Sequence, residues 1–253
     1  MLIWLAPSAC AAKSQGSKDK FADMTGQQIY DAGIAAQKKG SWYKSRGIMQ
    51  KALERSDTTP DLVARIHLAL ADSYFHDGGL VNLAEALSRY TNFLTFYPNH
   101  ELIDYAQYQL GLCHLRQALN PDRDQGETRK AVEELDRVMR RYPDSEWIDE
   151  AEAKADEARQ RIAEHDYRIG NFYFRQRSWS GSAERFRRLL EEFPRFSKKD
   201  RVYLQLGQSL LNLSRGDEAM LYLNRLVSEF PDSSHASEAR RLIARSAQPT
   251  ASK

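Results

Sequence analysis

The sequence predicts an all-α fold, an α-solenoid of five helix-turn-helix units with a long helix linking an N-terminal and a C-terminal half. The first observation is an aromatic residue followed by proline, which recurs with Tyr97, Tyr142, Phe193 and Phe230. The second is that apolar residues before each of these pairs keep the spacing of one helix face. The third is that small residues recur upstream at positions where two helices can cross.

The aromatic-proline pair explains where the helices end. In "VMRRYPDSEW" at residues 138–147, Pro143 has no backbone N–H and disfavours the helical conformation at Tyr142. Asp144 or Ser145 can then cap the next helix. Residues 95–102, 191–198 and 228–235 have the same pattern, so each predicts a helix end, a turn and a new helix.

The apolar stripe before each proline predicts the second helix of a unit. Counted back from the proline, a small residue stands twelve positions away, and larger apolar residues stand eight, five and four positions away. These steps follow 3.6 residues per turn, so the residues lie on one face. In chain order the members are Ala86, Tyr90, Phe93 and Leu94; Ala131, Leu135, Val138 and Met139; Ser182, Phe186, Leu189 and Leu190; and Ala219, Leu223, Leu226 and Val227.

The first helix of each unit is marked by a small residue, namely Gly33, Ala71, Gly111, Gly170 and Gly207. The distances to the next unit-ending proline are 27, 27, 32, 24 and 24 residues. Repeated pairs of helices with small crossing residues and a terminal proline are typical of tetratricopeptide (TPR) repeats. The sequence therefore predicts TPR units 1–3 over residues 26–143, and units 4–5 with a capping helix over residues 144–246. Residues 247–253 are predicted to form a disordered tail.

Two segments depart from the regular repeat. The stretch "NPDRDQGE" at residues 120–127 lengthens the turn inside the third unit. Between Pro143 and Gly170 no helix breaker occurs, so we expect one continuous helix from about Ser145 to Arg175. Its predicted apolar face consists of Ile148, Ala151, Ala155, Ala158, Ile162 and Ile169.

The N-terminus suggests a lipid anchor. Residues 1–10 end in Cys10 after the apolar run "MLIWLAPSA" and resemble the end of a bacterial lipoprotein signal, although Pro7 stands where such signals usually have leucine. We expect Cys10 to be lipidated and residues 11–25 to form a flexible tether. The alternative is an unmodified, frayed N-terminus.

The composition argues against several classes of function. The formal net charge is +2 over 253 residues, too small to indicate nucleic-acid binding, and no run of 18 apolar residues occurs. Cys113 stands among Leu110, Leu112 and Leu115, and His114 occupies a repeat position, so both are predicted to pack in the interior. The histidines have no metal-ligand spacing, and no phosphate-binding loop is present, so we expect neither an enzyme nor a cofactor.

Several segments go beyond a generic TPR pattern and resemble the BamD family, the TPR lipoproteins of the outer-membrane β-barrel assembly machinery. They are "GSWYKS" at 40–45, "YPNHELIDYAQYQLGL" at 97–112, "DRDQGETRKAVEELDRVMRRYPDSEWIDEA" at 122–151 and "EHDYRIGNFYFRQRSW" at 164–179.

The resemblance implies a lipid-anchored scaffold on the periplasmic face of the outer membrane. Its implied partners are the POTRA region of the barrel-forming subunit, other assembly lipoproteins and unfolded outer-membrane proteins. One alternative is a general periplasmic TPR scaffold for envelope or peptidoglycan proteins. A cytoplasmic TPR adaptor is a third reading, against which the N-terminal leader argues.

Aromatic residues of the first two units are candidates for a client-binding groove, because aromatic grooves suit extended segments. Tyr74 and Tyr90 stand at repeat positions, where a core role competes with exposure, whereas Tyr43 and Phe75 lie outside the stripe and are the better candidates. The full set is Tyr30, Tyr43, Tyr74, Phe75 and Tyr90.

The segment 174–193 is the candidate docking face for the barrel subunit. If Phe186 and Leu189 are buried, Arg185 and Arg188 lie three residues apart on one flank and can bind acidic groups. Arg177 and Trp179 complete the candidate set, and Arg185 matches an arginine of the family pattern. The alternative is that these arginines only pair with Glu184, Glu191 and Glu192 on a solvated face.

Overall fold

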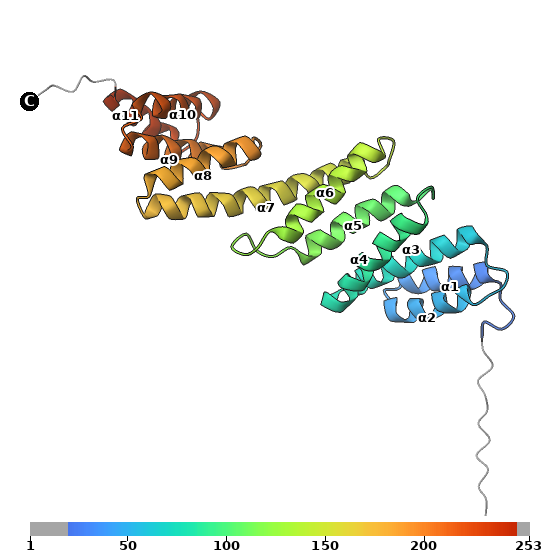
Figure 1. The fold of residues 1–253 in the computed structure, drawn as a ribbon. Helices are drawn as coiled ribbons and strands as arrows, with labels where there is room; N and C mark the ends of the chain where they lie inside the picture. Colours follow the sequence, from blue (N-terminus) through green and yellow to red (C-terminus); the bar gives the residue numbers. More distant parts are fainter. Residues whose placement is uncertain (1–19, 247–253) are drawn as a thin grey trace, which may run out of the picture. The chain divides into compact units, whose positions relative to one another are not determined.

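The computed structural model describes residues 20–246, and all regular structure in this range is helical (Figure 1). The prediction of an all-α solenoid is confirmed. The helices are α1 (Gly26–Lys38), α2 (Trp42–Leu53), α3 (Pro60–Asp77), α4 (Gly79–Phe96), α5 (Ile103–Gln117), α6 (Gly126–Arg141), α7 (Ile148–Arg175), α8 (Trp179–Glu192), α9 (Lys199–Asn212), α10 (Gly216–Glu229) and α11 (Ala236–Ser246).

The chain divides into two compact units, the first ending at Ser73 and the second beginning at Tyr74. The predicted boundary after Pro143 lies inside the second unit. Cys10 and the predicted tail at residues 247–253 lie outside the described residues, so their predictions stand as made.

The core of the first unit lies between α1, α2 and the first part of α3. Ile29, Met49 and Ile66 are almost completely buried in it. Ser45 Oγ donates a hydrogen bond of 3.0 Å to the Gly33 carbonyl, which fixes α2 against α1. Phe21 also packs into this core, so the predicted tether of residues 11–25 is wrong at its C-terminal end, where a large ring is removed from water.

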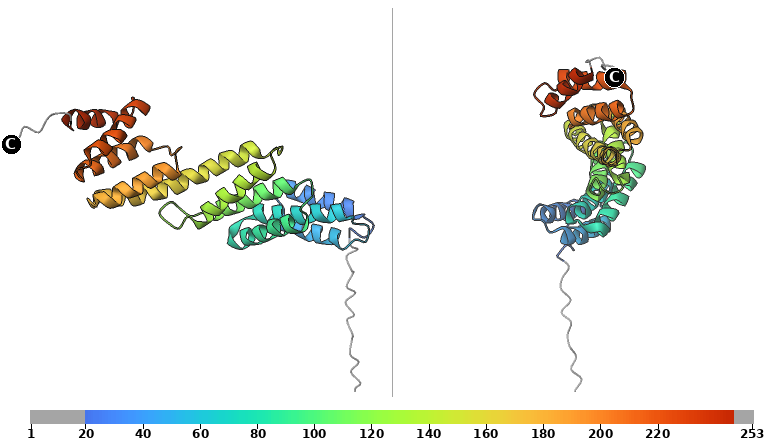
Figure 2. Two further views of the ribbon diagram at one scale, coloured as in Figure 1. Left: turned by 45° about the horizontal axis from the view of Figure 1, so that its top comes forward. Right: turned by 90° about the vertical axis from the view of Figure 1, so that its left-hand side faces the viewer.

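The second unit is built from helices that pack mainly on their neighbours in the chain, as the views of Figure 2 show for α5, α6 and α7. The crossings follow the predicted pairs of small and large residues. A Cβ added to Gly111 would lie 2.7 Å from Leu135, and one added to Gly207 would lie 2.6 Å from Leu223. The predicted small residues therefore stand where a partner side chain touches the backbone.

The predicted long helix is confirmed as α7, which has 28 residues. Ala151 and Ala155 pack with Leu135 of α6, whereas Tyr167 near the other end packs with Phe186 of α8. Figure 1 shows α7 beside α6 at one end and beside α8 at the other. One helix thus belongs to two consecutive helix pairs and joins them into one continuous array.

Candidate functional site

Helix α8 presents the predicted docking arginines beside a buried stripe. Phe186 and Leu189 are 0% and 1% exposed, as the repeat predicts. Arg185 is half-buried and Arg188 is exposed. The helix therefore uses one face for the core and places both guanidinium groups beside it.

Arg185 and Arg188 line a small hollow of about 110 Å³, which we call the arginine hollow. Helix α6 contributes Arg129 to it and α7 contributes Asp166. The periodicity of α8 gave no sign of either residue, because they stand on other helices. The complete lining is Arg129, Asp166, Arg185, Arg188, Leu189 and Glu192.

The charges of the hollow are unevenly paired. Arg188 Nε lies 2.8 Å from Glu192 Oε1, so this part of the predicted solvated pairing is present. Within residues 20–246, neither Arg129 nor Arg185 forms an ion pair. Burial raises the pKa of the Asp166 carboxyl above its ordinary value, and the positive charge of Arg129 partly opposes that effect.

The other two docking candidates lie elsewhere. Trp179 packs edge-to-face on Phe174, with ring centroids 5.5 Å apart, and lines a wider cavity of about 650 Å³ with Leu211 and Leu242. Arg177 is exposed in the turn after α7 and has a φ of 57°. The structure therefore brings Arg185 and Arg188 together but places Trp179 in a different cavity.

The predicted client-binding rings differ in exposure. In the first unit, Tyr43 is 83% exposed, and the Arg46 guanidinium lies 5.5 Å from its ring centroid. Tyr30 is half-buried against the core of the same unit.

In the second unit Phe75 is buried, contrary to expectation, whereas Tyr90 has the core role that its repeat position indicated. Tyr90 is fully buried because it belongs to the repeat stripe of α4. Phe75 is 6% exposed because Arg116 of α5 lies over it, 4.2 Å from the ring centroid, and donates a hydrogen bond to the Phe75 carbonyl. Tyr74 is half-buried, with Arg89 5.0 Å from its ring centroid.

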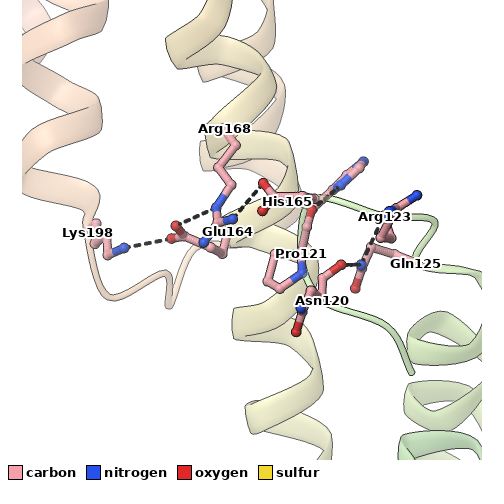
Figure 3. A network of polar contacts seen from close by, with 9 residues as sticks. Asn120, Pro121, Arg123, Gln125, Glu164, His165, Arg168 and Lys198 are labelled. Carbon is pink, nitrogen blue, oxygen red and sulfur yellow. Dashed lines mark hydrogen bonds and ion pairs between the residues drawn. The ribbon is translucent and has the colours of Figure 1, made fainter. Parts of the chain in front are cut away.

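The long turn between α5 and α6 is attached to α7 by a polar network, shown in Figure 3. His165 Nδ1 lies 2.6 Å from the Pro121 carbonyl oxygen, and Arg168 forms an ion pair of 2.6 Å with Asp122. Glu164 joins Arg168 to Lys198 in the turn before α9, at 3.1 and 2.8 Å. The insertion therefore contacts α7, the helix that contributes Asp166 to the arginine hollow.

Inside the turn, Gln125 replaces missing backbone hydrogen bonds. Its side chain is buried and donates to the carbonyls of Asn120 and Arg123, each at 3.0 Å (Figure 3). Thr128 Oγ1 donates to Gln125 Oε1 at 2.9 Å. Buried polar groups require partners of this kind, so the insertion is an ordered part of the third repeat.

We expect Arg168→Ala to loosen this turn without unfolding the protein. Both Arg168 and Asp122 are substantially exposed, so their ion pair is worth at most about 1 kcal/mol. Hydrogen exchange at residues 118–125 should accelerate, while the midpoint of thermal unfolding stays nearly constant. Arg161→Ala is the matched control, because Arg161 is also on α7 but, among residues 20–246, forms an ion pair only with Glu157, at 3.9 Å. Equal exchange in both variants would contradict the role of Arg168.

Cys113 and His114, which the sequence predicts to be interior residues, are both buried in the structure. Cys113 is completely buried, as predicted for a packing residue. His114 is also buried, and its Nδ1 lies 2.7 Å from Glu127 Oε2. Among residues 20–246, no cluster of three potential metal-ligating side chains occurs, and no helix is both long and apolar enough to cross a membrane.

Comparison with protein families gives two matches. Residues 22–206 match the model of a family described as outer membrane lipoprotein (YfiO). Residues 201–233 match a tetratricopeptide repeat model, in agreement with the helix pair α9 and α10.

Three curated relatives share the name outer membrane protein assembly factor BamD. The protein of Caulobacter vibrioides is 24% identical and the alignment covers 96% of this chain and 78% of the relative. The protein of Vibrio cholerae is 25% identical over 70% of this chain and 76% of the relative. The protein of Rickettsia prowazekii is 23% identical over 96% and 94%. Because the family model spans most of the sequence and relatives align along nearly all of it, this chain belongs to the BamD (YfiO) family of outer membrane lipoproteins.

Proposed function

We propose that this protein is an outer-membrane protein assembly factor that works as a non-catalytic TPR scaffold. The observation behind the proposal is the family match over residues 22–206, with relatives named as assembly factors. The shared name favours assembly over a general scaffold for envelope or peptidoglycan proteins. The protein would act at the outer membrane, on its periplasmic face.

The proposed partner is the POTRA region of the barrel-forming subunit, and the proposed contact is the arginine hollow. Arg185 supports this choice because it is held beside the core by α8 and has no ion-pair partner among residues 20–246. A guanidinium group presents two parallel N–H donors to a carboxylate, so an acidic surface is the matching partner. Other assembly lipoproteins are proposed as further partners.

Purification of the tagged protein in mild detergent, followed by mass spectrometry, tests the proposed function. We expect the barrel-forming subunit to co-purify in a near-stoichiometric amount. Recovery of peptidoglycan-associated proteins without the barrel subunit would overturn the proposal in favour of the general scaffold. An extract from cells that lack the tag is the control.

We further propose that Cys10 bears the lipid anchor. The residue lies outside the described part of the chain, and the description of its family as lipoproteins supports the proposal. Stable anchoring requires more than one acyl chain, and a lipoprotein cysteine supplies several. The intact mass of the native protein should correspond to a chain that begins at a lipidated Cys10. An unmodified N-terminus that retains Met1 would contradict it.

Client binding is proposed for the first unit, with Tyr43 as the main contact. Its ring is 83% exposed, whereas Tyr90 is completely buried, so only the former can touch an extended segment without rearrangement. A photoreactive analogue at position 43 should crosslink to a peptide from the C-terminal strand of an outer-membrane protein. Position 96 is a matched control, because Phe96 is also exposed, at 71%. Equal labelling at both positions would indicate nonspecific contact with exposed rings.

A further inference from the structure

A wide cavity near the C-terminal end of the second unit has no part in the functions proposed above. Helix α9 packs against both α7 and α11, and the cavity is lined by residues of these three helices and of the start of α8. We call it the terminal cavity. Its volume of about 650 Å³ is several times that of the arginine hollow and lies in the range of ligand-binding clefts.

Large apolar side chains form the walls of the terminal cavity. They are Phe174 of α7, Trp179 of α8, Leu211 of α9 and Leu242 of α11. All four are only half-buried, because each side chain is left partly open to water by the packing of the helices. Covering such surface with an apolar group of a partner is favourable. The walls therefore fit one large apolar side chain.

The charge of the terminal cavity is positive. Arg245, in the last turn of α11, is the one charged residue among the described residues that line it, and it is exposed. Arg175 and Arg177 stand between Phe174 and Trp179 in the sequence and are also exposed. Within residues 20–246, none of these three arginines forms an ion pair. An acidic group is therefore the complementary feature of a partner.

Side-chain amides extend the cavity along α9. Gln208 lines the cavity, and its side chain forms no hydrogen bond among residues 20–246. Gln205 stands one turn earlier on the same face, and its Nε2 donates a hydrogen bond of 2.8 Å to Asn171 Oδ1 of α7. Gln205 is 7% exposed, and its Oε1 has no hydrogen-bond partner in the described part of the chain. Because a buried acceptor without a donor is unfavourable, a peptide backbone N–H is a suitable ligand group here.

We propose that the terminal cavity binds an extended peptide segment in which an acidic residue follows a large apolar residue by two positions. The apolar side chain packs on Trp179 and Leu242, and the carboxylate pairs with Arg245. Side chains two positions apart point to the same side of an extended chain, about 7 Å from each other. The amides of α9 hydrogen-bond to the peptide backbone. This site uses no residue of the arginine hollow and goes beyond the proposed docking and client contacts.

Fluorescence anisotropy with a labelled peptide and the full-length protein in mild detergent tests the proposal. The probe is a short peptide of glycine and serine with blocked ends, one phenylalanine in the middle and one glutamate two positions after it. We expect saturable binding with a dissociation constant below about 1 mM, and about tenfold weaker binding when alanine replaces the phenylalanine. A wild-type protein that shows no saturable binding up to that concentration would overturn the proposal.

A double-mutant cycle across the complex tests whether the carboxylate meets Arg245. Arg245→Gln in the protein, or glutamine for glutamate in the peptide, should each weaken binding about fivefold, as for a partly exposed ion pair. Both changes together should cost no more than one, because they break the same pair. Arg241→Gln is the matched control: Arg241 is exposed on the same helix, pairs with Glu238 and does not line the cavity. Losses that multiply would show that the glutamate binds elsewhere.

The remaining outcomes separate this site from other ligands and from the proposed function. Binding only of a peptide with a free C-terminus would contradict an internal segment, and Arg245-dependent binding of phosphatidylglycerol vesicles without peptide binding would indicate a lipid site instead. Arg245→Gln should still co-purify the barrel-forming subunit; loss of that subunit would place the cavity inside the docking surface and refute a separate site. If the wild type binds the peptide but not the barrel subunit, the proposed function alone fails. Thermal unfolding of each variant must match the wild type.

Discussion

Replacing Arg185 by glutamate is expected to abolish co-purification of the barrel-forming subunit. Breaking one side of a desolvated, charged interface pair costs about 2–5 kcal/mol, so the affinity should fall by a factor of about 30 or more. Glutamate also reverses the charge that the partner carboxylate would meet. The measurement is the affinity of the purified proteins for each other, with thermal unfolding recorded on the same samples.

The side chains around Arg185 decide which control variants this experiment needs. A glutamate at position 185 would stand near Asp166, so Arg185→Glu should also lower stability slightly; Arg185→Gln avoids this repulsion and must still weaken binding. Arg187→Gln is the matched control on α8, because Arg187 is paired with Glu218 of α10 at 2.7 Å. It should cost up to about 1 kcal/mol of stability and leave docking unchanged. Full binding by folded Arg185→Gln would place the docking face elsewhere.

The sequence was sufficient to predict the helix pairs, because their determinants are local. Proline after an aromatic residue ends a helix wherever it occurs, and the stripe that contains Phe186 and Leu189 follows from helix geometry alone. The crossing at Gly111 was predictable for the same reason: a repeated small residue indicates a repeated close contact. The long helix α7 was predictable because no helix breaker occurs between Pro143 and Gly170.

The functional surface could be predicted only in part, because it depends on contacts between distant helices. Arg129 and Asp166 meet Arg185 only after α6, α7 and α8 have packed, and no pattern within one helix relates them. Phe75 was misjudged for a similar reason: it lies off its own stripe, yet Arg116 of α5 covers its ring. Side chains off the stripe can be buried by the next helix pair, which the period of a single helix does not show.

The crossing of α7 and α8 is expected to be among the most sensitive positions for stability. The Phe186 ring is completely buried, and a Cβ added to Gly170 would lie 2.6 Å from its Cε1 atom. Phe186→Ala should therefore cost about 3–5 kcal/mol, from lost burial and from the cavity that remains. Gly170→Ala should cost about 1–3 kcal/mol, because the ring is held by Tyr167, 6.0 Å away between centroids, and cannot move aside freely.

A double-mutant cycle tests whether these two costs have one cause. Phe186→Leu shortens the side chain that an alanine at 170 would meet, so Gly170→Ala should cost less in that background, by at least about 0.5 kcal/mol. Gly47→Ala is the control for the helix propensity of alanine: Gly47 lies within α2 with open space at its Cβ position, and the change should stabilise by about 0.5–1 kcal/mol. Chemical denaturation of the wild type, the two single variants, the double variant and the control gives all the free energies. If the costs of Gly170→Ala and Phe186→Leu simply add, the close approach at this crossing is not what makes glycine necessary at position 170.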